Sequence, residues 1–228
     1  MNNISCITVT RDRINHLSNC INLFIEQSYQ DKELIIVYYN TDKSTEKYLK
    51  AQHDRLVENN IKYYKFIEDD GMYLGAVRNF AISKAQGEYI CVWDDDDFHA
   101  PDRLEKQHQF CIDNELIGCT LRCLLIYSHK YRQFKLSFER DSGWEGSLLV
   151  KKEFMPRYKN LKSGEDTPVI DKLTINPNFK TLFNPDLYVY IFHDNNISGG
   201  RHKEEILGNS FDLNIEKSRE LYDKIYWL

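Results

Sequence analysis

Four apolar, β-rich runs recur along the first hundred residues, each about one βα unit after the last. They begin near Ser5, Glu33, Ile61 and Glu88, and helical periodicity fills the intervals between them. The first helical stretch follows Asp12, which is predicted as its N-cap. Strands that alternate with helices pack as a parallel sheet with both faces covered. The chain is therefore expected to have an α/β, Rossmann-like fold.

Three polar segments follow the predicted strands. They are "TRDR" at 10–13, "YYNTD" at 38–42 and "DDDD" at 94–97. Because sheets of this kind bind their ligands at the carboxyl ends of the strands, these segments are expected to meet at one edge. Pro101 starts a helix predicted over 101–114, which closes the acidic segment.

The rhythm changes beyond residue 115. Segments 118–128 and 132–140 are predicted as two antiparallel strands and 145–150 as another, with short helices near 151 and 168. No Pro/Gly/Ser-rich linker separates the two halves. We therefore expect a single domain that includes a partly amphipathic helical tail.

The charge balance excludes several classes of function. With 30 basic and 35 acidic residues the net charge is −5, so a long nucleic acid is not an expected partner. The apolar runs are much shorter than the ~20 residues of a membrane-spanning helix, and the start of the sequence lacks the basic region of a secretion signal. A soluble, cytoplasmic protein is expected, with its six cysteines as buried free thiols.

The acidic cluster Asp94 to Asp97 follows the fourth predicted strand. Adjacent carboxylates repel one another unless water or a cation separates them. One interpretation is a solvated turn without function. The other is a site for Mg²⁺ or a similar ion, which takes one or two carboxylates and completes its shell with water and phosphate oxygens. The position of the cluster at a strand end favours the metal.

Two further segments carry candidate groups. Glu165 and Asp166 precede a proline-started helix, where a carboxylate either caps free amides or acts as a general base. His193 follows a predicted strand, as a surface residue or as a ligand of an Mn²⁺-like ion, and Arg201 and Lys203 beyond it are suited to neutralise a phosphate.

Three segments together resemble the family 2 inverting glycosyltransferases with the type A (GT-A) nucleotide-sugar fold. They are "LGAVRNFAISKAQGEYICVWDDDDFHAPDRLEKQ" at 74–107, "GEDTPVI" at 164–170 and "YVYIFHDNNIS" at 188–198. In that family a Gly-x-x-Arg-Asn helix precedes a strand that ends in a D-x-D type motif. The segments "SCITVTRDR" and "LFIEQSYQDKELIIV" match the family's first βα unit, so the likeness covers nearly the whole chain.

The resemblance implies a metal site and a donor site around the acidic cluster. Asp96 is the implied main ligand of Mn²⁺ or Mg²⁺, together with Asp94 and His193, and Asp97 is expected just behind them. The implied nucleotide-sugar-binding residues are Thr10, Arg11, Tyr38, Tyr39, Arg78, Asp94 and Asp95.

One departure from the family concerns the end of the second strand. The family usually places an aspartate there that hydrogen-bonds the nucleotide base, whereas this chain has Tyr38 and Tyr39 before Asn40. A tyrosine can stack on the base or reach it through its hydroxyl. A UDP-sugar is slightly favoured over other donors.

The resemblance also implies the position of the catalytic base and the division of the domain. Asp166 corresponds to the base, with Glu165 as its neighbour, and Trp144 either stacks on an acceptor sugar or packs in the core. The single domain, 1–228, is then divided into a nucleotide-sugar-binding half (1–115), a mixed or antiparallel acceptor and catalytic-base half (116–202) and a helical tail (203–228).

The implied function is metal-dependent, inverting hexosyl transfer from a nucleoside diphosphate sugar to an acceptor hydroxyl. The expected acceptor is a saccharide or lipid-linked saccharide in polysaccharide or glycolipid assembly, with peripheral association with membrane assembly machinery. Two alternatives stay open. A nucleotidyltransferase would normally have a glycine-rich loop after the first strand, where this chain has "TVTRDRINHL". A non-catalytic nucleotide-binding module would bind the donor without releasing nucleoside diphosphate.

Overall fold

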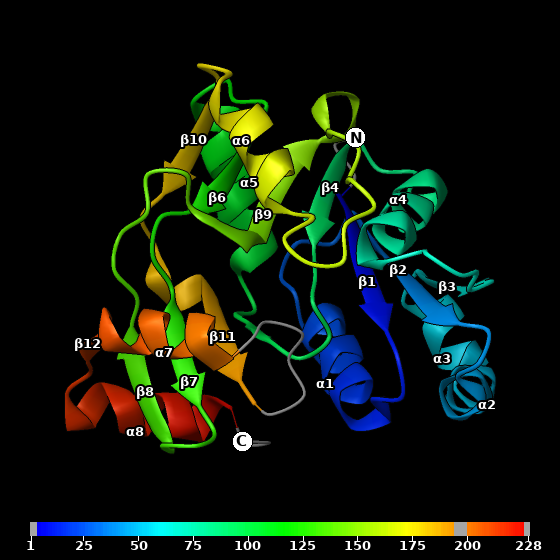
Figure 1. Cartoon of the computed structure of the whole chain (residues 1–228), viewed down its shortest axis with the longest axis horizontal. Coiled ribbons are helices and arrows are strands. Elements are labelled where there is room, and N and C mark those ends of the chain that lie inside the picture. Colours follow the sequence, from blue (N-terminus) through cyan, green and yellow to red (C-terminus); the bar gives the residue numbers. More distant parts are fainter. Residues whose placement is uncertain (1–3, 194–199, 226–228) are drawn as a thin grey trace.

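The computed structural model describes residues 4–193 and 200–225, and within them the strands form a sheet of seven and a sheet of five. The two sheets lie beside each other, with the smaller one next to the C-terminal helices (Figure 1). In spatial order, the strands of the larger sheet are β10 (Phe179–Leu182), β6 (Gly118–Leu121), β9 (Trp144–Lys151), β4 (Tyr89–Val92), β1 (Ile4–Thr10), β2 (Lys32–Tyr39) and β3 (Ile61–Phe66).

The first four strands of the chain are parallel, as their spacing with helices predicts. Strand β9 lies antiparallel between β4 and β6, which makes the sheet mixed at the side formed by the second half. The carboxyl ends of β1, β2 and β4 therefore share one edge, where the three polar segments were expected to meet.

Helices cover both faces of the parallel strands. Alternate side chains of β2 explain this: Leu34 and Ile36 pack in one core cluster, while Ile35 and Val37 pack in another on the opposite face. The first face is covered by α1 (Ile14–Ile25), α2 (Lys43–Ala51) and α3 (His53–Glu58), and the second by α4 (Leu74–Lys84).

The first helix begins differently from the prediction. Arg13 is its N-cap residue and makes no side-chain cap hydrogen bond. Asp12 instead has a φ of 53°, and its main-chain N–H donates to Asp42 Oδ2 at 2.7 Å. A short polar residue can adopt this left-handed conformation where the chain turns sharply, so Asp12 forms the turn and does not cap the helix.

The smaller sheet includes only the second part of segment 118–128, which was expected to be one strand. Its strands, in spatial order, are β12 (Phe211–Asp212), β8 (Gln133–Leu136), β7 (Leu125–Ser128), β11 (Tyr188–Phe192) and β5 (Phe98–His99). The predicted single strand is thus two strands in different sheets, β6 and β7. Between them the N–H of Arg122 donates to Leu182 O and the N–H of Leu124 to Ser137 Oγ. An apolar run alone does not distinguish one strand from two joined at a bend.

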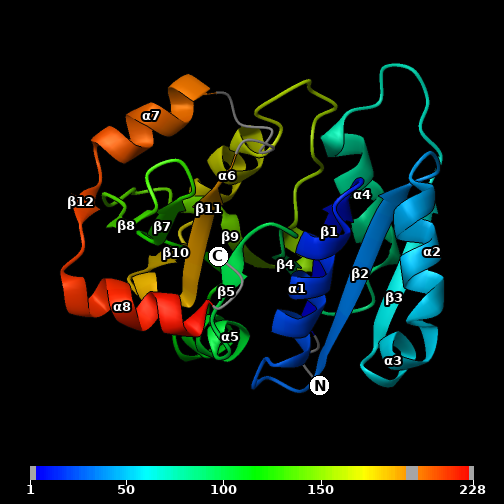
Figure 2. The same ribbon diagram turned by 90° about the horizontal axis from the view of Figure 1, so that it is seen from below.

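The remaining helices follow the predictions closely, with α5 (Arg103–Asp113) inside the expected 101–114. The short helices near 151 and 168 are η1 (Lys152–Phe154) and α6 (Thr167–Thr174), and η2 (Pro185–Leu187) precedes β11. The tail contains α7 (Gly200–Gly208) and α8 (Ile215–Lys224), which lie along the outer side of the smaller sheet (Figure 2). Tyr222 of α8 contacts Tyr127 and Phe134 there.

Two sequence expectations about the interior are met. All six cysteines are buried free thiols. Trp144 is buried in the core, with the Arg140 guanidinium 3.8 Å from its ring centroid. In the described part of the chain, no helix combines the length and the apolar character needed to traverse a bilayer.

Candidate active site

The acidic segment lies between the end of β4 and β5, and Arg13 links it to the first βα unit. The Arg13 Nη1 donates to Asp95 Oδ1 at 3.2 Å and to Asp96 Oδ2 at 2.7 Å. Because Arg13 follows β1, this pairing brings the carboxyl ends of β1 and β4 together. Of the three segments that were expected to meet, 10–13 and 94–97 are therefore in contact, and Asp12 links 10–13 to Asp42 of the third.

Asp96 also contacts the histidine predicted as its partner in a metal site. His193 Nε2 lies 3.0 Å from Asp96 Oδ2, and the ring of His16 stacks on that of His193 with centroids 4.9 Å apart. Burial raises the pKa of Asp96, but the hydrogen bond with His193 and the charge of Arg13 outweigh this effect and leave the pKa below its usual value.

Asp95 is a buried carboxylate with a raised pKa. It is 4% exposed, and burial, followed by the charge of Asp96, raises its pKa to about 7. Its Oδ2 is buried and has no hydrogen-bond partner within the described residues. The hydroxyl of Thr10 at the end of β1 lies close enough to lower the pKa of Asp95, although it does not form a well-aligned hydrogen bond.

This donor set fits a divalent cation with few protein ligands. It offers a carboxylate beside an imidazole, and a buried carboxylate oxygen that has no hydrogen-bond partner among the residues the structure describes. Within 4–193 and 200–225, no three His, Cys, Asp or Glu side chains converge on one point. Mg²⁺ commonly takes one or two protein carboxylates and completes its shell with water and phosphate oxygens, so a cation held here would take most of its ligands from water and a bound phosphate.

Asp97 has a structural role behind the segment. Its carboxylate accepts hydrogen bonds from the Tyr188 hydroxyl and, at 2.9 Å, from the Ile191 N–H. Burial raises the pKa of Asp97 well above its usual value. Asp97 thus fastens β11 to the acidic segment, and β11 in turn places His193 opposite Asp96.

Arg78 of α4 joins the acidic segment to the second predicted site segment. Its Nη2 donates to Asp94 Oδ1 at 3.1 Å and its Nη1 to Glu165 Oε1 at 3.2 Å. Burial lowers the pKa of Arg78, but the neighbouring carboxylates, with Asp94 the largest contribution, raise it above the ordinary value. Arg78, Asp94 and Glu165, which are far apart in sequence, therefore form one cluster.

Asp166 lies next to this cluster and caps a helix. Its carboxylate accepts from the Thr167 N–H at 2.9 Å at the start of α6, as the structural interpretation of "GEDTPVI" expects. Asp166 is half-buried, and its charge acts on both Arg78 and Asp94. A carboxylate has a second oxygen and further lone pairs beyond the one used in capping, so helix capping and proton transfer are compatible.

The two tyrosines at the end of β2 point to opposite faces. Tyr38 is buried in the core on the side of α1 and α2. Tyr39 lies on the other face, with the Arg11 guanidinium 4.7 Å from its ring centroid, and Arg11 also pairs with Glu68 at 2.8 Å. Of the residues predicted to bind the nucleotide at the ends of β1 and β2, Arg11 and Tyr39 therefore lie in contact.

Sequence reasoning did not assign Arg13, His16 or the buried pair His99 and Arg103. The Arg103 side chain is fully buried; its Nη1 donates to His99 Nδ1 at 2.5 Å and its Nη2 to Val92 O at 3.2 Å. His99 Nε2 then donates to Asp94 O at 3.2 Å, which holds the main chain of the acidic segment. The i, i+4 spacing of a histidine and an arginine after four aspartates was the available signal.

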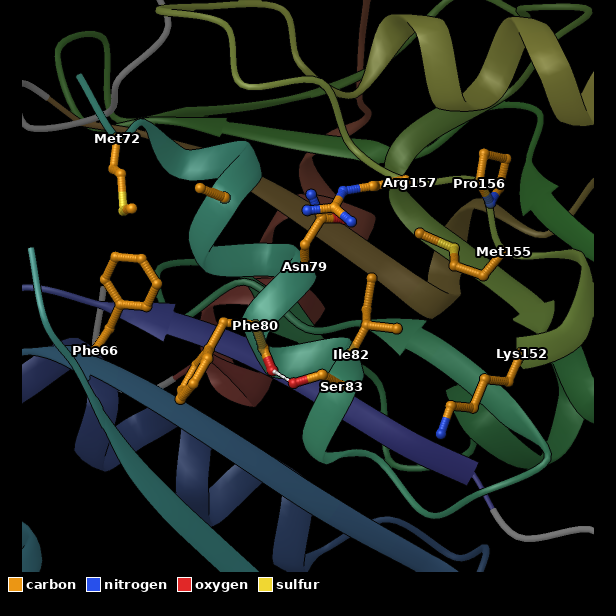
Figure 3. Close-up of a pocket in the computed structure, with 11 residues that line it drawn as sticks. Phe66, Met72, Asn79, Phe80, Ile82, Ser83, Lys152, Met155, Pro156 and Arg157 are labelled. Atoms are coloured by element: carbon orange, nitrogen blue, oxygen red, sulfur yellow. Dashed lines mark hydrogen bonds between the residues drawn. The ribbon is translucent and has the colours of Figure 1, made fainter. Parts of the chain in front are cut away.

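The side chains of Arg201 and Lys203 and the segment 194–199 lie outside the described residues. A separate groove of about 560 Å³ lies on the other side of α4 and contains none of the predicted site residues (Figure 3). It is mainly apolar, with Phe66, Met72, Phe80 and Met155 among its lining residues. The acidic segment, and not this groove, is therefore the candidate site.

The comparisons with known proteins agree on the family. The model of glycosyl transferase family 2 matches residues 5–169. An uncharacterized glycosyltransferase of Haemophilus influenzae is 36% identical over 99 residues, which are 43% of this chain and 36% of that protein. The O-antigen biosynthesis glycosyltransferase WbnJ of Escherichia coli is 29% identical over 123 residues, 53% of this chain and 47% of that protein. The chain spans less than half the length of each of these relatives.

Solved structures show the same fold. S. aureus TarS 1–349 in complex with UDP-GlcNAc superimposes with a TM-score of 0.68 at 16% identity, over 99% of this chain and 73% of that one. The mannosyltransferase PcManGT from Pyrobaculum calidifontis, in complex with GDP-Man and Mn²⁺, gives 0.67 at 14% identity, over 90% of this chain and 62% of that one. The chain therefore belongs to glycosyl transferase family 2, and its mostly parallel sheet with flanking helices is the nucleotide-sugar type A fold.

Proposed function

We propose that this chain is a metal-dependent, inverting glycosyltransferase that moves a hexose from a nucleoside diphosphate sugar to an acceptor hydroxyl. The observation that carries the proposal is the bridge made by Arg78, whose guanidinium contacts Asp94 and Glu165 at once. It links the acidic segment, suited to a diphosphate and its cation, to the segment that carries Asp166. A donor and an acceptor bound at these two segments would be neighbours.

On the donor side, Asp96 and His193 are the proposed metal ligands, with Asp94 as a further candidate. Their carboxylate and imidazole groups suit Mn²⁺ and Mg²⁺, and PcManGT is solved in complex with Mn²⁺. When bound, the cation would neutralise charge on the departing diphosphate, which is worth several kcal/mol of barrier. Arg13 and Arg78 add fixed positive charge on two sides of the aspartates.

Recognition of the nucleotide is assigned to the strand ends beside the aspartates. Thr10, Arg11 and Tyr39 lie at the ends of β1 and β2, and the Tyr39 ring and the Arg11 guanidinium offer stacking surfaces for a base. Asp95 and Asp94 are proposed to contact ribose and diphosphate. A UDP-sugar is the first donor to test, since TarS is solved with UDP-GlcNAc. A GDP-sugar is the second, since PcManGT is solved with GDP-Man.

On the acceptor side, Asp166 is the proposed general base. Its carboxylate removes the proton of an acceptor hydroxyl, whose oxygen attacks the anomeric carbon while the nucleoside diphosphate leaves on the opposite face, so the configuration inverts. General base catalysis typically contributes ~10² to 10⁴ in rate. Glu165 is held by Arg78 beside it and is proposed to orient the acceptor.

The proposed acceptor is a saccharide or a lipid-linked saccharide in the assembly of a surface polysaccharide. The named role of WbnJ in O-antigen biosynthesis supports this class. Peripheral association with membrane assembly machinery on the cytoplasmic side is part of the same proposal. So is the division into a donor half (1–115), an acceptor half (116–202) and a tail (203–228).

The test is a screen of nucleoside diphosphate sugars with Mn²⁺ or Mg²⁺ that measures the nucleotide released with and without saccharide acceptors. Release of a nucleoside diphosphate that depends on the cation and on one donor is the expected result. Release of pyrophosphate would replace glycosyl transfer by nucleotidyl transfer. Binding of a nucleotide without any release across the panel would indicate a module that does not turn over.

A further inference from the structure

We propose that Asn79, together with Gly75 on the same helix, is a positioning residue that holds the segment bearing Asp166 against α4. The inference deepens the proposed function and rests on it, because Asp166 is the proposed base. It also assigns a role to the two positions of the Gly-x-x-Arg-Asn pattern that the site itself does not use, since only Arg78 touches its carboxylates.

Asn79 satisfies both polar main-chain groups of one residue in the segment between β9 and α6. Its Nδ2 donates to Tyr158 O at 2.8 Å, and its Oδ1 accepts from the Tyr158 N–H at 3.0 Å. Figure 3 shows Asn79 extending from α4 toward the part of this segment that contains Pro156 and Arg157. A primary amide presents a donor and an acceptor side by side, so a carboxylate or an apolar side chain cannot make both bonds.

Gly75, one turn earlier on α4, lets the segment approach the helix backbone. A Cβ at this position would lie 2.1 Å from Lys159 O and 3.4 Å from Glu165 Cβ. The first distance is far inside van der Waals contact with a main-chain atom. Any side chain at position 75 would therefore push the segment away from the helix at the residues that lead to Glu165.

A second amide makes the reciprocal contact. Asn160 of the segment donates through Nδ2 to Gly71 O at 2.7 Å and accepts from the Tyr73 N–H at 2.8 Å, just before α4 begins. Each side thus offers one asparagine to the main chain of the other. We call these contacts of Asn79, Gly75 and Asn160 the α4 clasp.

The α4 clasp matters because it adds main-chain contacts to one buried side chain, Tyr158, which packs in a core cluster with the Arg78 guanidinium 5.4 Å from its ring centroid. Residues 155–164 contain no helix or strand, and most of their side chains are exposed, with Tyr158 the buried exception. At the far end of the segment, Glu165 pairs with Arg78, which is the residue before Asn79 on α4. The same helix therefore contributes Arg78 to the site and holds the segment that leads to the proposed base. A displacement of about 1 Å at a reacting group can lower a rate by ~10².

The experiment compares Asn79→Ala and Gly75→Ala with a matched control, Asn114→Ala. Asn114 also donates its amide to a main-chain carbonyl, Phe110 O at 2.9 Å, but at the end of α5 and outside the site. Two readouts are taken on each purified variant. One is amide hydrogen exchange across the chain, and the other is kcat of nucleotide release from the donor found in the screen, alongside the Kd for UDP with Mn²⁺.

The α4 clasp predicts at least about tenfold faster exchange of the Tyr158 N–H in both clasp variants, because its bond to Asn79 Oδ1 is lost or weakened, with the parallel sheet unchanged. It also predicts a kcat about 10 to 100 times lower with the Kd for UDP within about twofold of wild type. Asn114→Ala should match wild type in both readouts. Unchanged exchange of the Tyr158 N–H, or a kcat equal to that of wild type, would overturn the inference.

Failure of the proposed function gives a different pattern. If wild type releases no nucleotide from any donor, glycosyl transfer is refuted, while the exchange measurement still decides the α4 clasp by itself. An equal loss of kcat and of UDP affinity in Asn79→Ala would show that Asn79 acts on the donor side, and that result also overturns the positioning role.

Discussion

The acidic segment and the segment that carries Asp166 are built in contrasting ways. Asp95 and Asp97 are buried at 4% and 2% exposure, and the segment is cross-linked by Arg13, Arg78, His193 and Tyr188. Asp166 is half-buried, and within the described residues its carboxylate accepts one short-range hydrogen bond, from the N–H of the next residue. The carboxylates of the acidic segment are held by several side chains, whereas the Asp166 segment is held on either side of Asp166, by the Glu165 pair with Arg78 and by the buried apolar residues of α6.

The contrast follows from the cost of burying charge. A buried carboxylate is tolerated only when cations or hydrogen-bond donors surround it, or when it takes up a proton. The acidic segment uses both solutions, because Asp96 is paired with Arg13 while burial raises the pKa of Asp95 to about 7. Asp166 is partly in water and needs little support. The acidic segment, which is proposed to bind the donor, is therefore pre-formed by its own pairings, whereas the position of Asp166 depends on the contacts of its neighbours.

The largest expected effect tests the charged side of this contrast. Asp96→Asn should lower kcat/KM by at least about 10³ and remove its dependence on Mn²⁺ or Mg²⁺, because several kcal/mol of charge neutralisation would be lost. The measurement is nucleotide release with and without added cation. Asp186→Asn, which alters an exposed carboxylate paired with Lys217 at 3.0 Å, should behave as wild type. Wild-type turnover by Asp96→Asn would refute the metal assignment.

The next effect tests the attached side. Asp166→Asn should lower kcat by ~10² to 10⁴ with the donor Kd unchanged, since the carboxylate is proposed to act on the acceptor. Asparagine is as good an N-cap as aspartate, so the midpoint of thermal unfolding should stay close to that of wild type. Asp166→Ala removes both roles and should lose stability as well. A stable Asp166→Asn variant with full activity would leave Asp166 as a helix cap alone.

A third prediction concerns stability within the acidic segment. Tyr188→Phe removes the hydroxyl that donates to buried Asp97, and we expect a loss of about 1 to 3 kcal/mol in the free energy of unfolding, because a buried acceptor loses a donor. Urea unfolding measures it. The matched change Tyr222→Phe removes a hydroxyl bonded to Arg132 O at 2.7 Å on the exposed surface and should cost clearly less. Equal losses would mean that burial is not what makes the Asp97 contact important.

The smallest effect asks whether a buried carboxylate can be stabilised without a cation. Asp42 caps α2 and accepts from the N–H groups of Thr45 and Asp12 and from the Ser44 hydroxyl. Burial raises the pKa of Asp42, but these hydrogen bonds, led by Thr45, lower it overall to about 2. Asp42→Ala should cost about 1 to 2 kcal/mol of stability at neutral pH.

The pH dependence of that loss has a defined sign. Because the folded pKa of Asp42, about 2, lies below its ordinary value of 3.8, its contribution is present above about pH 4 and disappears as the pH falls through about 2. Wild type and Asp42→Ala should therefore converge in stability under acid. A difference that stays constant from pH 6 to pH 2 would contradict the assigned cause.

Local patterns were sufficient for most of the fold and for part of the site. The alternation of apolar runs and helical periodicity predicted β1 to β4 and the helices between them, and "DDDD" after β4 predicted where carboxylates gather. The same patterns failed where one sequence pattern is compatible with two local structures. An apolar run at 118–128 became β6 and β7, and Asp12 became a turn residue because its N–H is bonded to Asp42.

What the sequence determined by itself is the order of elements and the chemistry available at the strand ends, since both follow from periodicities of a few residues. The tertiary structure alone decided which charges meet. Arg13 reaches Asp96, 83 positions away, and Asn79 reaches Tyr158, 79 positions away. The packing of the sheet also decided that Tyr38 is buried in the core while Tyr39 lies against Arg11. Such pairings depend on how sheets and helices pack, because the distance between two side chains across a fold is not encoded in the spacing of either along the chain.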